Sequence, residues 1–77
     1  MSLIKTQFYT IVRDGGKMIA QKQNGWTDNN FNYYENKSDN QWYAIEPLTG
    51  LSICSSYSRK AVVELANSEK IQKKLED

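Results

Sequence analysis

The residue types that perform most enzyme chemistry are sparse in this sequence. It has no histidine, which removes the commonest general base and the commonest metal ligand. Its one cysteine, Cys54, has no activating partner indicated by the sequence, and one cysteine is too few for a structural zinc site. Carboxylates such as Asp14, Glu46 and Glu64 stand singly along the chain. The pattern therefore predicts a protein that is not an enzyme and that uses no cofactor or metal.

The glycine-containing run at residues 13–17, RDGGK, is too short for a phosphate-binding loop and lacks its spacing. Asp14, Gly15 and Gly16 instead tolerate positive φ, so the run predicts a hairpin turn. The alternating, β-branched residues 3–14 would form the first strand and residues 17–23 the returning one. Asn24-Gly25 is expected to end the second strand by turn chemistry.

Basic and aromatic side chains offer a second chemistry. On a sheet, interleaved aromatic and cationic residues stack bases and hold phosphates. The net charge is only +1, whereas a dedicated nucleic-acid binder usually has a basic surface. Cations at the start of a helix are slightly disfavoured. The sequence shows no stabilising contact that would offset this cost for Arg59 and Lys60, which open the predicted helix. Nucleic-acid binding is therefore the alternative function, with five candidate contacts: Arg13, Lys17, Lys22, Arg59 and Lys60.

Length and composition predict one domain over residues 1–77 with a thin, marginally stable core. No apolar run approaches the roughly 18 residues that span a bilayer, and the first residues lack the pattern of a signal peptide. A single cysteine fits a free thiol in a reducing compartment. We therefore expect a cytoplasmic protein with no membrane partner.

Residues 27–41 are rich in Asn and Asp, which compete with regular structure through local side-chain hydrogen bonds. They predict a long loop with a short strand around residues 31–35. Two interpretations stay open, a tolerated structural loop and part of a binding surface.

Residues 42–66, WYAIEPLTGLSICSSYSRKAVVELA, predict a strand, a tight turn, a strand and a helix. Residues 47–50 would form the turn and place Glu46 opposite Leu51, Ala44 opposite Ile53 and Trp42 opposite Ser55. Ser58 is a good N-cap for the helix. Past Asn67 the helix is expected to bend or to restart at Ser68, with Ile71 and Leu75 as a second apolar stripe.

The expected fold class is α+β, a small antiparallel sheet of three to five strands with a C-terminal helix packed on one face. The predicted core is the following set, with Trp42 at its edge: Phe8, Val12, Ala44, Leu51, Ile53, Val62, Leu65 and Ala66.

Residues 41–66 resemble a pattern common in small uncharacterised prophage proteins of Gram-positive bacteria. The pattern has a Trp-bearing strand, a Thr-Gly turn, an Ile-bearing strand and a helix that starts with Ser and then Arg or Lys. The unit also looks like the three-stranded DNA-binding domain of tyrosine integrases. Arg59 and Lys60 resemble part of the lysine cluster that opens the last helix of double-stranded RNA-binding domains. The first resemblance implies a bacteriophage-derived protein, and the other two imply nucleic-acid contacts.

One helix covers one face of a sheet, and strand alternation sends a second set of apolar side chains to the other face. This predicts an exposed row at Tyr9, Ile11, Tyr43 and Ile45. Exposed apolar patches with tyrosines usually mark an interface. The predicted function is a non-enzymatic protein-interaction module that binds a protein partner or forms a homodimer through this row. The alternative is that residues 27–41 fold back and cover the face with Phe31, Tyr33 or Tyr34.

Overall fold

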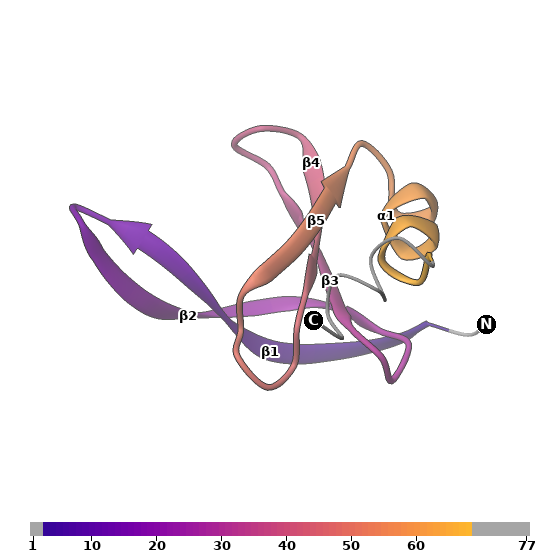
Figure 1. The fold of residues 1–77 in the computed structure, drawn as a ribbon, viewed down its shortest axis with the longest axis horizontal. Coiled ribbons are helices and arrows are strands. Elements are labelled where there is room, and N and C mark those ends of the chain that lie inside the picture. Colours follow the sequence, from indigo (N-terminus) through magenta and orange to yellow (C-terminus); the bar gives the residue numbers. More distant parts are fainter. Residues whose placement is uncertain (1–2, 69–77) are drawn as a thin grey trace.

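The computed structural model describes residues 3–68, which form a five-stranded antiparallel sheet followed by one helix (Figure 1). The strands follow one another in the sheet in chain order. They are β1 (Ile4–Asp14), β2 (Lys17–Thr27), β3 (Asn32–Asn36), β4 (Gln41–Ile45) and β5 (Ser52–Ser56), and the helix is α1 (Arg59–Ala66). The α+β prediction is confirmed, with the sheet at the upper end of the expected strand number.

The β1–β2 hairpin is the longest feature of the fold. Its two strands pair from Ile4↔Thr27 to Asp14↔Lys17, and the turn between them holds Gly15 and Gly16 at φ values of 57° and 84°. Two consecutive positive φ angles match the right-handed twist of the flanking strands, as the sequence predicted. The far end of the hairpin extends beyond the other strands (Figure 1).

The expected turn at Asn24-Gly25 is wrong, because β2 continues through both residues to Thr27. Gly25 is needed for a different reason. A Cβ atom there would lie 2.1 Å from the carbonyl oxygen of Tyr33 and 2.9 Å from a ring carbon of Phe8. The missing side chain therefore allows β3 and the Phe8 ring to approach β2 closely.

Residues 27–41, expected to be a long loop with a short strand, form two loops with a strand between them. The strand is β3, which confirms the short strand predicted around residues 31–35. Tyr33 of β3 lies opposite Trp26 of β2 and Ala44 of β4. The segment therefore forms the central strand of the sheet.

The turn between β4 and β5 also follows the prediction. Gly50 has a φ of 75°, its N–H donates to the carbonyl oxygen of Glu46 at 2.8 Å, and Glu46 N–H donates to Leu51 at 2.9 Å. The pairing beyond the turn is shifted, because a bulge lies between Ala44 and Ile45. Cys54 and not Ile53 lies opposite Ala44, and Ser56 and not Ser55 lies opposite Trp42. The expected register was therefore off by one residue.

Helix α1 begins as predicted, because the side chain of Ser58 accepts a hydrogen bond from Ala61 N–H at 3.1 Å. The helix ends at Ala66 and is capped by Asn67. The second stripe expected at Ile71 and Leu75 lies outside the described residues. Val62 and Ala66 pack on one face of the sheet, which we call the helix side, in a cluster with Phe31, Tyr33 and Ala44.

The other face of the sheet, the far side, has a separate cluster of Phe8, Tyr34 and Ile45. The Tyr34 ring packs against Phe8 with centroids 6.2 Å apart and stacks on Tyr43 at 5.7 Å. Phe8 is therefore buried as predicted, but on the side of the sheet opposite to Ala44. Residues 27–41 do not fold back over this face: Tyr34 packs there from within the sheet as part of β3, and Phe31 and Tyr33 belong to the helix side.

The predicted core is thus right for some residues and wrong for others. Phe8, Ala44, Val62 and Ala66 are buried. Leu51 and Leu65 are exposed, because Leu51 flanks the β4–β5 turn and because Leu65 lies away from the buried stripe of Val62 and Ala66. Three residues are half-buried: Val12, Trp42 and Ile53.

The sheet curls until its first strand meets the turn between its last two. Ile11 N–H and the hydroxyl of Thr10 both donate to the carbonyl oxygen of Gly50, at 2.7 and 3.1 Å. These bonds fix the position at which β1 leaves the body of the molecule. Residues 11–20, which lie beyond it, are called the hairpin arm below.

We expect Ile45→Ala to reduce the free energy of unfolding by about 2–5 kcal/mol, because Ile45 is fully buried in the far-side cluster. Leu48→Ala is the matched control, since Leu48 is 96% exposed and its truncation should change stability by less than about 0.5 kcal/mol. Urea unfolding followed by tryptophan fluorescence measures both. Equal, small effects of the two changes would contradict the far-side cluster.

Candidate interaction surfaces

Asp28 is the one buried carboxylate among residues 3–68, and its position was not anticipated from the sequence. It accepts hydrogen bonds from Phe31 N–H at 2.9 Å and Asn30 N–H at 3.0 Å. Its other oxygen accepts from the hydroxyl of Tyr33 at 2.6 Å and from the amide of Asn67 at 3.0 Å. These four donors come from the β2–β3 loop, from β3 and from the end of α1.

The electrostatics of this cluster favour a fixed structural role. Burial alone would raise the pKa of Asp28, but the hydrogen bonds from Tyr33, Phe31, Asn30 and Asn67 together lower it. Burial and the Asp28 carboxylate both raise the pKa of the Tyr33 hydroxyl. The carboxylate therefore stays ionised and the phenol stays protonated near neutral pH, so neither group is poised for proton transfer.

Cys54 is half-buried against the helix-side cluster, and burial raises the pKa of its thiol. A thiolate, which is the nucleophilic form, is disfavoured in that position. Within residues 3–68, no three Cys, Asp or Glu side chains lie close enough together to bind a metal ion. The described residues also present candidate interaction surfaces.

Trp26 is the centre of one such surface. Its ring is half-buried on the helix side, with Arg59 at 4.6 Å and Lys5 at 5.5 Å from the ring centroid. Both distances allow cation–π attraction. The contact with Trp26 therefore offsets the cost of placing Arg59 at the start of α1, which the sequence did not reveal. A shallow hollow continues from Trp26 along the hairpin past Gln7 and Asn24, whose side-chain amides hydrogen-bond at 2.8 Å.

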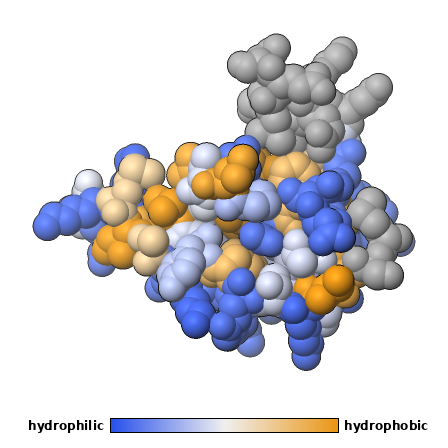
Figure 2. All heavy atoms as spheres, turned by 90° about the horizontal axis from the view of Figure 1, so that it is seen from below, coloured by the Kyte–Doolittle hydropathy of each residue, from blue (hydrophilic) through white to orange (hydrophobic). Residues whose placement is uncertain are grey.

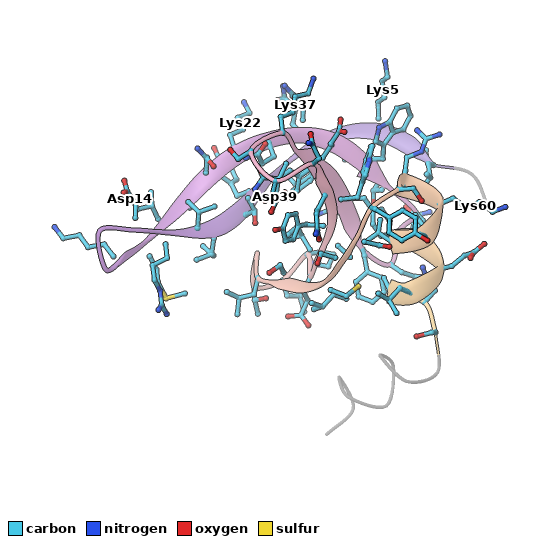
Figure 3. All side chains as sticks on the ribbon, turned by 90° about the horizontal axis from the view of Figure 1, so that it is seen from above. Lys5, Asp14, Lys22, Lys37, Asp39 and Lys60 are labelled. Carbon is cyan, nitrogen blue, oxygen red and sulfur yellow. The ribbon has the colours of Figure 1, made fainter. Side chains whose placement is uncertain are left out.

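The five candidate nucleic-acid contacts do not form one patch. Arg13 and Lys17 lie in the hairpin arm, and Lys60 points away from the other labelled lysines (Figure 3). Lys22 projects from the same side of the molecule as Lys5 and Lys37, which sequence reasoning missed (Figure 3). The hairpin register was the signal that could have identified Lys5, because counting back from Gly15-Gly16 places it opposite Trp26.

The four residues predicted to form one exposed row are divided between the two sides of the sheet. Ile45 is fully buried and Tyr43 is half-buried beside Tyr34, both on the far side. Tyr9 is 62% exposed and lies on the opposite side, next to Lys22 on the neighbouring strand. The expectation of an exposed Ile45 is therefore wrong. It assumed that Phe8 and Ala44 share a face, whereas the pairing through β2 and β3 places them on opposite faces.

The hairpin arm has accessible apolar side chains. Met18 is 63% and Ile19 is 43% exposed, and Ile11 and Val12 lie across the ribbon from Ala20 and Ile19. Leu48 and Leu51, in and beside the β4–β5 turn, are also exposed. Figure 2 shows hydrophobic surface on the projecting part of the molecule, behind a hydrophilic tip, and further hydrophobic surface on the body. Because alternate residues face opposite ways, both faces of the arm are partly apolar.

No protein-family model, curated protein or solved structure matches this chain significantly. The resemblance of residues 41–66 to prophage proteins and to nucleic-acid-binding modules therefore stays a prediction. In the part of the chain that the structure describes, no helix has the length and hydropathy needed to cross a bilayer.

The Asp28 cluster predicts a defined pH dependence of stability. The folded-state pKa lies below the unfolded value of about 3.9, so the carboxylate stabilises the fold above that pH and loses this contribution as pH falls through the folded pKa. Asp28→Asn should reduce the free energy of unfolding at pH 7 by about 1–3 kcal/mol, because Tyr33 and Asn67 lose their ionised acceptor.

The difference between the two proteins should shrink as pH falls below about 4, where the unfolded state takes up a proton, and it should vanish only below the lowered folded-state pKa. Denaturant unfolding between pH 3 and pH 7 measures it. Asp39→Asn is the control, because Asp39 accepts from Tyr43 at an exposed position. A pH-independent difference for Asp28→Asn would show that the hydrogen-bonded carboxylate does not stabilise the fold.

Proposed function

We propose that this chain is a non-enzymatic interaction module that binds another protein surface through its hairpin arm. The observation that carries the proposal is the exposure of Met18 and Ile19 on opposite faces of a two-stranded ribbon. Both side chains lie at the same open strand edge, and exposed apolar surface gathered in one place often marks an interaction site. A two-stranded ribbon is also marginally stable by itself, so a partner that adds contacts would stabilise it.

The proposed surface keeps part of the row predicted from sequence. Ile11 lies in the arm, and Tyr9 lies two residues before it on the same face of β1. Both therefore remain candidate contacts. Tyr43 and Ile45 leave the proposed surface because they pack in and beside the far-side cluster. The apolar residues of the β4–β5 turn extend the surface, since Gly50 in that turn accepts the hydrogen bond from Ile11 at the base of the arm.

A bacteriophage-derived origin and a bacterial cytoplasmic location accompany this proposal. They are supported by the resemblance of residues 41–66 to prophage proteins and by the single free cysteine. A non-enzymatic role is supported by the state of the two most reactive candidates, since Asp28 is held by four donors and Cys54 is kept as a thiol by burial.

Capture by the immobilised chain from a nuclease-treated bacterial lysate, to which the untagged chain has been added, tests the arm. The unmodified chain should retain one or more proteins, and Ile19→Lys should lose them, because a charge replaces an apolar contact at the centre of the arm. Tyr57→Lys is the matched control, since Tyr57 is 84% exposed beyond the end of β5, outside the arm. If Ile19→Lys retains the same proteins as the control, the arm is not the binding surface.

Nucleic-acid binding is the second candidate, and the arrangement around Trp26 favours it. Lys5 lies opposite Trp26 and Lys22 lies opposite Tyr9, so cations and aromatic rings alternate along one side of the hairpin. Lys37 projects in the same direction (Figure 3). This is the combination that holds phosphates and stacks unpaired bases in single-stranded nucleic acid.

A labelled single-stranded oligonucleotide tests this second candidate. Affinity should fall steeply with salt, and Lys5→Glu combined with Lys22→Glu should weaken binding and make the logarithmic salt slope shallower by about 1 for each lost phosphate contact. Arg13→Glu combined with Lys17→Glu is the control with the same charge change, placed near the tip of the arm. An equal loss with this control would indicate nonspecific attraction and would argue against a binding face at Trp26.

A further inference from the structure

We infer that the partner of the hairpin arm is a second copy of this chain, joined by antiparallel pairing of the two β2 edges around Ile19. The inference rests on the proposed function, because it uses the same arm and names what binds there. It depends on three features of β2: an open backbone edge, an apolar centre and an arrangement of charges that permits self-pairing.

The outer edge of β2 is open along the arm. β2 pairs with β3 only at Trp26 and Thr27, and no other described strand pairs with its outer edge between Lys17 and Gly25. The direction of its backbone groups follows from the hairpin, because Ile11 N–H points outward to Gly50 and Ile11 lies opposite Ala20. By strand alternation the N–H and C=O groups of Met18 and Ala20 also point outward.

A strand edge with unpaired backbone groups is a template for another strand. In two copies related by a two-fold axis at Ile19, Met18 of each copy lies opposite Ala20 of the other. The outward groups of these residues then form about four backbone hydrogen bonds. The two Ile19 side chains face each other in a close pair between these bonds, which is the contact that stabilises sheets most directly.

This register also brings apolar side chains together on both faces of the joined sheet. On one face, Val12 and Ile19 of each copy form a continuous row across four strands, because Val12 lies opposite Ile19 within the hairpin. On the other face, Ile11 and Ala20 of one copy lie beside Met18 of the next. Met18 and Ile19, which are exposed in one copy, would be covered in two.

The charges along β2 are compatible with a two-fold dimer. In this register Lys17 lies opposite Gln21 and Lys22 lies opposite Gly16, so no like charges meet. The net charge of +1 gives two copies little mutual repulsion. A two-fold contact uses the same edge of both copies, which leaves no β2 edge for a third copy. A pair is therefore expected, and a filament is not.

Disulfide trapping tests the register. Ile19→Cys in a Cys54→Ala background should form a covalent dimer on mild oxidation, because opposed residues in a close antiparallel pair have Cα atoms about 4.5–5.5 Å apart, within disulfide range. Gln21→Cys in the same background is the control, since Gln21 would lie opposite Lys17 and far from its own copy. Equal trapping at both positions, or none at Ile19→Cys, would overturn the proposed register.

A second variant tests edge pairing without oxidation. Ala20→Pro removes an outward N–H that makes no bond within the hairpin, so the single chain should still fold. Sedimentation equilibrium should show dimers of the unmodified chain and about ten- to a hundredfold weaker dimerisation of Ala20→Pro, because about two interchain hydrogen bonds are lost. A monomer at every accessible concentration of the unmodified chain would overturn the inference.

The two proposals fail in different ways. If the unmodified chain is a monomer but Ile19→Lys still loses captured proteins, self-pairing is wrong and the arm binds a different protein. If Ile19→Lys changes neither capture nor sedimentation, the arm is not an interaction surface and both proposals are wrong.

Discussion

The ionised carboxylate of Asp28 is the contact on which the arrangement of sheet and helix depends. It joins the β2–β3 loop, the central strand and the C-terminal end of α1 through four hydrogen bonds. Asn67 extends the network by donating to Val63 O at 2.8 Å and accepting from Asn30 at 3.0 Å. A buried charge is tolerated only when it is paired or fully hydrogen-bonded. The need to satisfy it therefore fixes where the short helix ends and, through Tyr33, which face of β3 it covers.

The two sides of the sheet follow from that constraint. With Tyr33 on the helix side, the pairing Trp26↔Tyr33 places Trp26 there too, where Arg59 and Lys5 contact its ring. Alternation along the hairpin then sends Phe8 to the far side, against Tyr34 and Ile45. Gly25 permits both arrangements, since any side chain there would collide with the Tyr33 carbonyl. One glycine and one carboxylate thus connect the two small cores.

Local signals in the sequence predicted most of the elements, but not the full length of β2 or the faces on which side chains lie. The Gly15-Gly16 turn, Gly50 and the Ser58 cap depend on neighbouring residues, and each was predictable. The side occupied by Phe8 depends on the register of β2 against β3, which is set by contacts between residues that are distant in the sequence. Because of the bulge beside Ile45, Cys54 and not Ile53 lies opposite Ala44. A one-residue shift of this kind moves every later side chain of the strand to the other face of the sheet. Asp28 was missed although three of its four donors lie within five residues of it. The fourth donor, Asn67, is 39 positions away and approaches only in the folded chain.

The arm differs from the rest of the chain in what its apolar residues contribute to folding. Neither buried cluster includes a residue from 11–20, and the half-buried residues packed against those clusters lie elsewhere too. A marginal domain gains little by extending a ribbon past its own core, and an exposed edge with apolar side chains is a liability in solution. Lys17 and Lys22 flank the apolar segment and limit uncontrolled strand addition without covering its centre. Because folding alone does not account for Met18 and Ile19, a specific contact outside the single chain is the physical explanation that their positions favour.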